Sequence, residues 1–377
     1  MPKVHIGKTV IIHKDPFAYI SHPSITITKR GEWVAAFNHS RRREPRQHPP
    51  TDPLFRTIIA RSKDQGETWS DPYFAPDFDY YGTECPGIET LKDGTVVLTQ
   101  FRFAWYPLAV ARKRRAAGEL ISLHLHRRGW TEDFTDADWE SSRFTWARGY
   151  HGVYVHLSED EGYSFDTTVK LDTDRFRDGY SRTGVEELSD GRLAYVVTEH
   201  HPPHSQYTYI VFSQDRGRTW SKPTVVVDQG PDMSKRQFSE PDVLEVNPGE
   251  LLCILRDSKK TGYLHSTRSL DGGATWTPTE QTTMFGHPGH LLKLSDGRIL
   301  CTYGRREAPF GIRAALSEDG GRTWLVDDEI VIRADLPNGD LGYPTTIEYA
   351  PGRLFVCYYG QEPDGVTCVQ GTYVELG

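Results

Sequence analysis

Short apolar segments recur along the chain, each followed by a glycine turn and a second apolar segment. Within many of these segments apolar and polar positions alternate, which is typical of β-strands, and the glycine between two such segments predicts a hairpin. The pattern occurs six times, with turn glycines at Gly31, Gly94, Gly191, Gly249, Gly297 and Gly352. We therefore expect six similar two-stranded hairpins.

An octapeptide of the form Ser-x-Asp-x-Gly-x-Thr-Trp is repeated out of phase with these hairpins. Its copies are Ser62–Trp69, Ser213–Trp220, Ser269–Trp276 and Ser317–Trp324, with a degenerate copy at Ser158–Phe165. Ser and Asp side chains can satisfy the backbone groups of a turn, glycine accepts positive φ, and tryptophan can anchor the turn on a sheet. The octapeptide thus predicts a second hairpin turn in each repeat.

Two hairpins per repeat give four strands, and six four-stranded sheets bury their faces by packing against each other in a ring. We therefore predict an all-β fold, a six-bladed β-propeller of four-stranded antiparallel blades, as a single domain over residues 1–377. The last four octapeptides begin 55, 56 and 48 residues apart, but the first two begin 96 apart, which indicates a partly helical insertion at about residues 107–150. A strand near Val4–Ile12 is expected to pair with the C-terminal strands and close the ring.

Composition narrows the classes of function. The 44 Lys and Arg residues against 52 Asp and Glu give a net charge of −8, which argues against a protein that binds nucleic acid by neutralising phosphates. No segment has the apolar length of a membrane span or of a secretory signal. The five cysteines are widely spaced without a CxxC pair, as expected for buried thiols in a reducing compartment. We expect a soluble cytoplasmic protein whose partners are neither nucleic acids nor membranes.

Ionisable and phenolic side chains occupy equivalent positions of the repeats. In a propeller these positions converge on the axis, where a ligand would bind. The positions at the start of the first strand of each hairpin hold His22, Cys85, Arg182, Glu240, His287 or Pro288, and Tyr343. The positions seven or eight residues after the turn glycine hold His39, Arg102, Glu199, Arg256, Arg305 and Tyr359.

The octapeptides inside six propeller repeats resemble the Asp boxes of the sialidase (neuraminidase) superfamily, and the resemblance covers essentially the whole chain. Asp boxes lie on the rim of the propeller and occur in non-enzymatic propellers too, so they indicate the fold and not the activity. Sialidases use a tyrosine nucleophile assisted by a glutamate, an aspartate as acid and base, and three arginines that hold the substrate carboxylate.

The resemblance implies a role for several residues of this chain. Tyr343 stands where the nucleophile is expected, and Glu240 stands where its assisting glutamate is expected. Asp52, ten residues before the first Asp box, lies in the loop of the acid/base aspartate. Arg256 and Arg305 match the second and third arginines. A phenol with a pKa near ~10 is a poor nucleophile unless a base takes its proton, which Glu240 could do.

The chain departs from the family pattern at its first arginine. The expected Arg-Ile-Pro is replaced by Ser21-His22-Pro23, and Arg102 of the next blade is the candidate to compensate. His22, His39 and Glu199 complete the predicted substrate-binding set.

Two other clusters of polar side chains, one of histidines and one basic, stand out in the sequence. The histidines that follow Glu199 (His200, His201 and His204) lack a third convincing ligand, so no metal and no cofactor is predicted. The basic run Arg112–Arg115 in the insertion is expected to be a solvated helix face or, alternatively, a contact between subunits of a homo-oligomer.

Three functions follow from these residues. The first is an exo-acting glycoside hydrolase of the sialidase type that cleaves a terminal acidic sugar from a glycan or oligosaccharide. The second is a polysaccharide lyase that cleaves a uronic-acid glycan by β-elimination, with His22, His39 or Tyr343 removing the proton. The third is a propeller that binds carbohydrate without catalysis.

Overall fold

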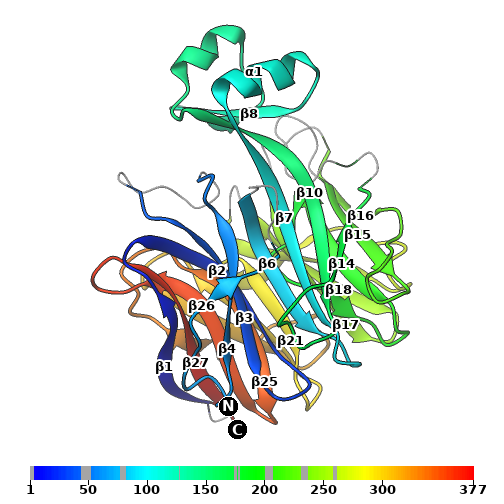
Figure 1. The fold of residues 1–377 in the computed structure, drawn as a ribbon. Helices are drawn as coiled ribbons and strands as arrows, with labels where there is room; N and C mark the ends of the chain where they lie inside the picture. Colours follow the sequence, from blue (N-terminus) through cyan, green and yellow to red (C-terminus); the bar gives the residue numbers. More distant parts are fainter. Residues whose placement is uncertain are drawn as a thin grey trace.

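Six antiparallel sheets arranged as the blades of a propeller make up the protein (Figure 1), which confirms the predicted all-β architecture. The computed structural model describes residues 4–43, 52–76, 82–126, 128–173, 176, 179–199, 207–230, 237–257 and 261–377. The sheets are named below as blades 1 to 6 in chain order.

The first three blades contain the N-terminal half of the chain. Blade 1 consists of β2 (Ala18–Ile27), β3 (Trp33–Arg41), β4 (Arg56–Ser62) and β5 (Tyr73–Phe74). Blade 2 consists of β6 (Gly82–Thr90), β7 (Val96–Pro107), β10 (Trp146–Ser158) and β11 (Thr167–Lys170). Blade 3 consists of β12 (Gly179–Tyr180), β13 (Glu186–Glu187), β14 (Leu193–Glu199), β15 (Tyr207–Ser213) and β16 (Thr224–Asp228).

The remaining blades follow without insertion. Blade 4 consists of β17 (Phe238–Asn247), β18 (Glu250–Asp257), β19 (Tyr263–Ser269) and β20 (Glu280–Phe285). Blade 5 consists of β21 (Gly289–Lys293), β22 (Ile299–Arg305), β23 (Gly311–Ser317) and β24 (Ile330–Arg333). Blade 6 consists of β25 (Gly342–Ala350), β26 (Arg353–Gln361), β27 (Thr367–Leu376) and β1 (Val4–Lys14).

The ring is closed by the two ends of the chain, as predicted. Strand β1 pairs antiparallel with β27, from Val4 opposite Leu376 to Lys14 opposite Cys368. The innermost strands contact each other around the axis, with β2 touching both β6 and β25, and β17 touching β13 and β21. This closure brings side chains from the first and last blades together.

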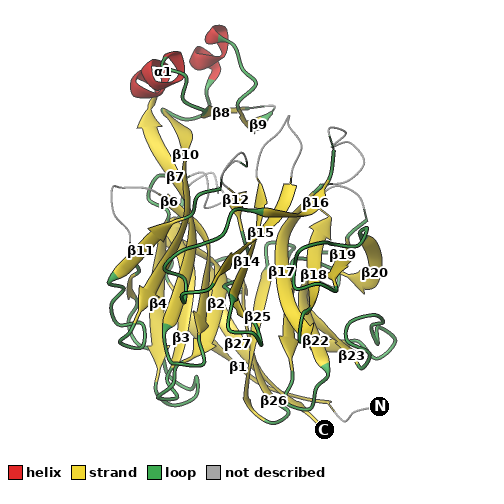
Figure 2. Cartoon of the chain, turned by 90° about the vertical axis from the view of Figure 1, so that its right-hand side faces the viewer, coloured by secondary structure: helices red, strands yellow, loops and turns green. Residues whose placement is uncertain are grey.

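The insertion begins where β7 leaves the propeller. It holds α1 (Leu108–Ala116), β8 (Ile121–Leu125), β9 (Gly129–Thr131) and the short 3₁₀ helix η2 (Asp136–Ser141), and it projects beyond the ends of the blades (Figure 2). A small core that includes Ala111, Leu123 and Trp139 holds it together. The basic run of α1 is paired locally, since Arg112 forms an ion pair with Glu140 at 2.6 Å. No helix among the described residues is long and apolar enough to cross a membrane.

The strands nearest the axis are buried on both faces, because each blade is covered by a neighbour on either side. In β2 the run from Ala18 to Thr26 is buried at every position. The five cysteines all lie in such buried positions as thiols, as the sequence predicted.

The Asp boxes form one hydrogen-bonded turn repeated five times. In the last copy the Ser317 hydroxyl accepts the amide proton of Gly321 at 2.7 Å and donates to Asp319 Oδ1 at 2.8 Å. The Thr323 amide donates to Asp319 Oδ1 at 2.9 Å, and its hydroxyl donates to Oδ2 at 2.6 Å. Burial acts to raise the pKa of Asp319, but these hydrogen bonds outweigh it and lower the pKa to about 2. The turn therefore holds an ionised carboxylate.

This geometry predicts a loss of stability in acid. The folded-state pKa of Asp319 lies below the value of about 3.9 for an unfolded aspartate, so its stabilisation is complete above about pH 4 and is lost as the pH falls through about 2. Asp319→Asn should lower the free energy of unfolding at pH 6 by about 1 kcal/mol and flatten its decline between pH 4 and pH 2.5, as measured by urea denaturation.

The control is Glu318→Gln, which removes an exposed carboxylate from the same turn. It should leave both the free energy of unfolding at pH 6 and its acid dependence close to the values of the unsubstituted protein. Equal acid dependence in the Asp319→Asn protein and the unsubstituted protein would contradict the assignment.

Candidate functional site

Four of the innermost strands carry the same irregularity at the residue before a proline. Strands β2, β6, β17 and β25 each lose their pairing register there. The four residues at these positions have positive φ angles: 52° at His22, 44° at Cys85, 49° at Glu240 and 50° at Tyr343. Positive φ in a residue other than glycine costs of order 1–3 kcal/mol and is concentrated at functional sites. The bulges therefore indicate that the axial ring is the candidate functional site.

Two of these residues meet across the axis. The Tyr343 hydroxyl of blade 6 donates a hydrogen bond to Glu240 Oε1 of blade 4. The two side chains belong to residues that are only 6% and 4% exposed, respectively. The sequence reasoning placed both residues in one site, and the structure brings them into direct contact.

An arginine completes this contact from the next strand. Arg256 on β18 reaches Glu240 Oε2 through its Nη1 at 2.8 Å. Burial acts to raise the pKa of Glu240, but Arg256, the Tyr343 hydroxyl and Arg306 outweigh it and lower the pKa to about 2. Burial and the Glu240 charge together hold the pKa of the Tyr343 phenol well above its ordinary value. The shared proton therefore resides on Tyr343, and Glu240 is the acceptor.

The other arginine facing Tyr343 is the neighbour of the one predicted. Arg306 has its Cζ 5.4 Å from the centroid of the Tyr343 ring, whereas Arg305 lies 5.2 Å from the ring of Phe285. Arg306 Nε and Nη2 are buried and have no hydrogen-bond partner among the described residues. Strand β22 ends at Arg305, and successive side chains alternate, so only one of the two adjacent arginines faces the ring. The sequence analysis named Arg305 for this role, whereas the structure places Arg306 beside the Tyr343 ring.

Two aromatic side chains lie beside Tyr343, and one of them is hydrogen-bonded to a carboxylate. The His22 ring lies edge-on to the Tyr343 ring at 4.1 Å, and His22 Nδ1 is 2.8 Å from Ser21 Oγ. The Tyr359 ring is 6.0 Å from that of Tyr343, and its hydroxyl donates to Asp340 Oδ1 at 3.1 Å. Tyr19 donates to the same oxygen at 2.5 Å. Sequence reasoning missed the Asp340 contacts, since only ring closure joins Tyr19 to blade 6.

Asp52 is buried but is held by other residues. It is 2% exposed, and Arg43 contacts it through two nitrogens at 2.6 and 2.9 Å. The Leu54 amide also donates to Asp52 Oδ1 at 2.9 Å. Arg43 Cζ in turn lies 5.2 Å from the ring of Trp146, at the base of the insertion. In the described part of the chain these contacts link Asp52 to the insertion rather than to Tyr343 or Glu240.

The remaining predicted residues, Arg102, His39 and Glu199, have other neighbours. Arg102 donates to the Pro76 carbonyl at 2.6 Å and to Gln100 at 2.9 Å within blade 2. His39 is 3.6 Å from Asp15. Glu199 is buried at the end of β14, and the three histidines that follow it lie outside the described residues. Among the residues that are described, no group of three His, Cys, Asp or Glu side chains could hold a metal ion.

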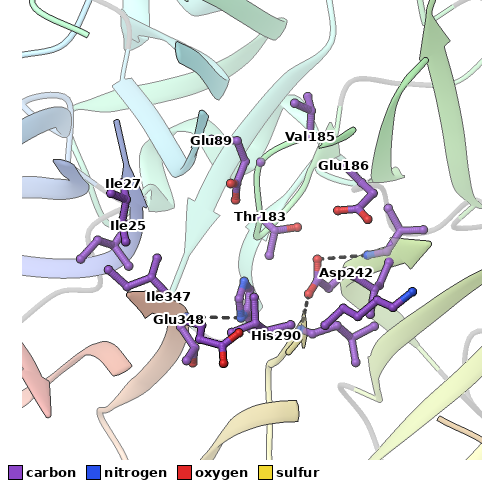
Figure 3. Close-up of a pocket in the computed structure, with 17 residues that line it drawn as sticks. Ile25, Ile27, Glu89, Thr183, Val185, Glu186, Asp242, His290, Ile347 and Glu348 are labelled. Carbon is purple, nitrogen blue, oxygen red and sulfur yellow. Dashed lines mark hydrogen bonds between the residues drawn. The ribbon is translucent and has the colours of Figure 1, made fainter. Parts of the chain in front are cut away.

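A cavity of about 340 Å³ lies further along the same innermost strands. It is lined by carboxylates from four blades, Glu89, Glu186, Asp242 and Glu348, together with His290 (Figure 3). Burial raises the pKa of Glu186 to about 8 and that of Asp242 to about 6, and burial lowers the pKa of His290 to about 3. Glu186 is therefore mostly neutral near pH 7, and Asp242 accepts hydrogen bonds from the amides of Val243 and Leu291 at 3.0 and 2.6 Å.

The fold and the axial ring together define a sialidase-like propeller. The family model described as a BNR repeat-like domain matches residues 136–356, so the chain belongs to the BNR repeat-like domain family. No curated protein sequence matches the chain.

Solved structures extend the likeness of fold to the whole chain. A protein of unknown function from Dyadobacter fermentans superposes with a TM-score of 0.82 at 27% identity, covering 100% of both chains. The NanB sialidase from Streptococcus pneumoniae gives a TM-score of 0.68 at 14% identity, covering 97% of this chain and 70% of that one. The Trypanosoma rangeli sialidase gives 0.59 at 15% identity, covering 100% and 59%. The sialidases share the fold.

The buried ion pair generates a prediction for stability. Arg256→Met leaves the Glu240 carboxylate buried without its cation, so it should lower the free energy of unfolding by about 3 kcal/mol. Adding Glu240→Gln removes that charge and should restore more than half of the loss. Urea denaturation of both single variants and the double variant measures the coupling. Strictly additive losses would show that the two groups do not interact.

Proposed function

We propose that the protein is an exo-acting glycoside hydrolase of the sialidase type, with Tyr343 as nucleophile and Glu240 as its base. The observation that carries the proposal is the buried hydrogen bond from the Tyr343 hydroxyl to Glu240 Oε1, supported by Arg256 on the second carboxylate oxygen. A phenol in contact with a carboxylate can lose its proton as it attacks, which an isolated tyrosine does poorly.

The proposed reaction has two steps. Tyr343 Oη bonds to the anomeric carbon while its proton passes to Glu240 Oε1, and the glycosidic oxygen leaves with a proton from Asp52. Water then attacks the anomeric carbon, the bond to Tyr343 Oη breaks, and Glu240 returns the proton to the phenol while Asp52 takes one from the water. The anomeric configuration is retained, since each step inverts it.

An acidic sugar fits the charges around the nucleophile. Arg256 and Arg306 both act on Tyr343, and Glu240 neutralises only one of them. Arg306 keeps buried N–H groups without partners among the described residues. A guanidinium fork binds a carboxylate bidentately, so the excess positive charge favours an anionic substrate over a neutral one. Action in the cytoplasm stays a prediction from the sequence.

Removal of either member of the pair should strongly reduce the turnover of aryl glycosides of acidic sugars. Tyr343→Phe should reduce kcat at least ~10³-fold, and Glu240→Gln should reduce it about 10²- to 10⁴-fold, because the nucleophile or its base is lost. Release of the aryl alcohol measures both rates. Tyr163→Phe, at a half-exposed rim tyrosine that donates to Glu32, is the matched control and should retain full activity. Activity of the Tyr343→Phe protein equal to that of the control would exclude the proposed nucleophile.

The acid role of Asp52 is tested through the leaving group. Asp52→Asn should slow the release of a poorly acidic alcohol by about 10²-fold or more, and should hardly affect an aryl leaving group that departs without a proton. The ratio of kcat/KM for two such substrates measures this. An equal loss for both substrates would assign Asp52 to holding Arg43 and the insertion in place.

One observation favours a second candidate function. His22 occupies the position of the first sialidase arginine and lies edge-on to Tyr343 at 4.1 Å, and a tyrosine beside a histidine could remove a sugar-ring proton in a polysaccharide lyase. β-Elimination leaves an unsaturated sugar that absorbs in the ultraviolet, whereas hydrolysis does not. Incubation with uronic-acid polysaccharides, followed by ultraviolet absorbance, separates the two chemistries.

A further inference from the structure

The third blade contributes a buried arginine to the ring that holds Glu240 and Tyr343. Arg182 occupies the same repeat position in blade 3 as these two residues do in blades 4 and 6. It is 2% exposed. It forms no ion pair with any described residue, and its Nε and Nη1 are buried without a hydrogen-bond partner among them. A guanidinium buried in this way is costly, because little in its surroundings replaces the water it has lost.

The contact that Arg182 does make is with the peptide next to the nucleophile. Its Nη2 donates to the carbonyl oxygen of Pro344, the residue that follows Tyr343. Its Cζ lies 5.9 Å from the centroid of the Tyr343 ring. Tyr343 and Pro344 form the bulge in which Tyr343 has a φ of 50°. Arg182 therefore holds the strained peptide that aims the phenol at Glu240.

The charge of Arg182 also lies close to the reacting pair. Burial lowers the pKa of Arg182, while Asp242 and Glu240 act in the opposite direction, and a guanidinium remains protonated in proteins. When Tyr343 gives its proton to Glu240, its oxygen gains negative charge before the new bond is complete. A fixed cation inside the protein stabilises such a developing charge more strongly than water does.

We propose that Arg182 is a positioning residue for Tyr343, fixing the bulge through the Pro344 carbonyl and supplying positive charge from inside the propeller as the phenol attacks. The inference rests on the proposed function of Tyr343. It adds a residue that lies outside the set predicted to touch the substrate. Its role is distinct from those of Arg256 and Arg306, which are half-buried and partly open to solvent.

The test compares kcat with KM in Arg182→Gln and Arg182→Lys proteins, using an aryl glycoside of an acidic sugar. Arg182→Gln should lower kcat about 10²-fold and leave KM within about threefold, because the interaction operates in the transition state and not in substrate binding. Arg182→Lys keeps the charge without the planar guanidinium group. Its kcat should therefore be at least fivefold higher than that of the Arg182→Gln protein. Arg61→Gln, which removes a buried rim arginine paired with Glu32 at 2.8 Å, is the control for folding and should leave kcat unchanged.

The outcomes separate the inference from the function on which it rests. If the unsubstituted protein turns over no such glycoside, the proposed function fails. If it is active and the folded Arg182→Gln protein has the same kcat, or if KM rises in step with the fall in kcat, the positioning role is overturned. Should Arg182→Gln not fold, Arg182→Lys decides alone: a fivefold or greater fall in kcat at constant KM supports the role, and an unchanged kcat overturns it.

Discussion

The axial site depends on a backbone constraint, the bulge at positive φ that precedes a proline in four of the innermost strands. In a regular strand successive side chains alternate between two faces, and in a blade both faces are already covered by neighbouring blades. A bulge interrupts this alternation and re-aims one side chain. Tyr343 and Glu240 are bulge residues of different blades, and they meet because the ring places their strands around one axis. Each strained bulge persists because the surrounding sheet holds its backbone in place.

The electrostatics of the site follow from this convergence. Burial alone would favour a neutral Glu240, but Arg256 and Arg306 reverse that preference, and the carboxylate stays ionised. The same carboxylate, with burial, keeps the proton on Tyr343. This one contact thus pairs a proton donor, Tyr343, with a proton acceptor, Glu240. Their pKa values are shifted in opposite directions although both side chains are buried. In the cavity lined by Glu89, Glu186 and Asp242, burial and the repulsion between carboxylates instead raise the pKa of Glu186.

The sequence was informative wherever a physical requirement repeats. Turn glycines, Asp-box aspartates and anchoring tryptophans recur because every blade needs the same two hairpins, so the propeller and its closure by β1 could be predicted. The pairing of Glu240 with Tyr343 followed from the repeat position and the family resemblance. The choice between Arg305 and Arg306 did not, because it depends on where β22 ends. The contacts of Asp52 with Arg43 and of Arg102 with Gln100 are side-chain choices that no periodicity encodes.

His22 stands where the family resemblance predicts the first arginine. This difference changes the charge around Tyr343 more than it changes the backbone of the strand. His22 keeps the bulge and the proline of its strand, so the backbone geometry is preserved, and its ring packs on Tyr343. Positive charge is instead supplied by Arg306 at one side of the phenol and by Arg182 from within. A ligand carboxylate would then be held mainly from blades 4 and 5. The fold is shared with sialidases at low identity, whereas under the proposed function the recognition of the sugar would be set locally by these few side chains.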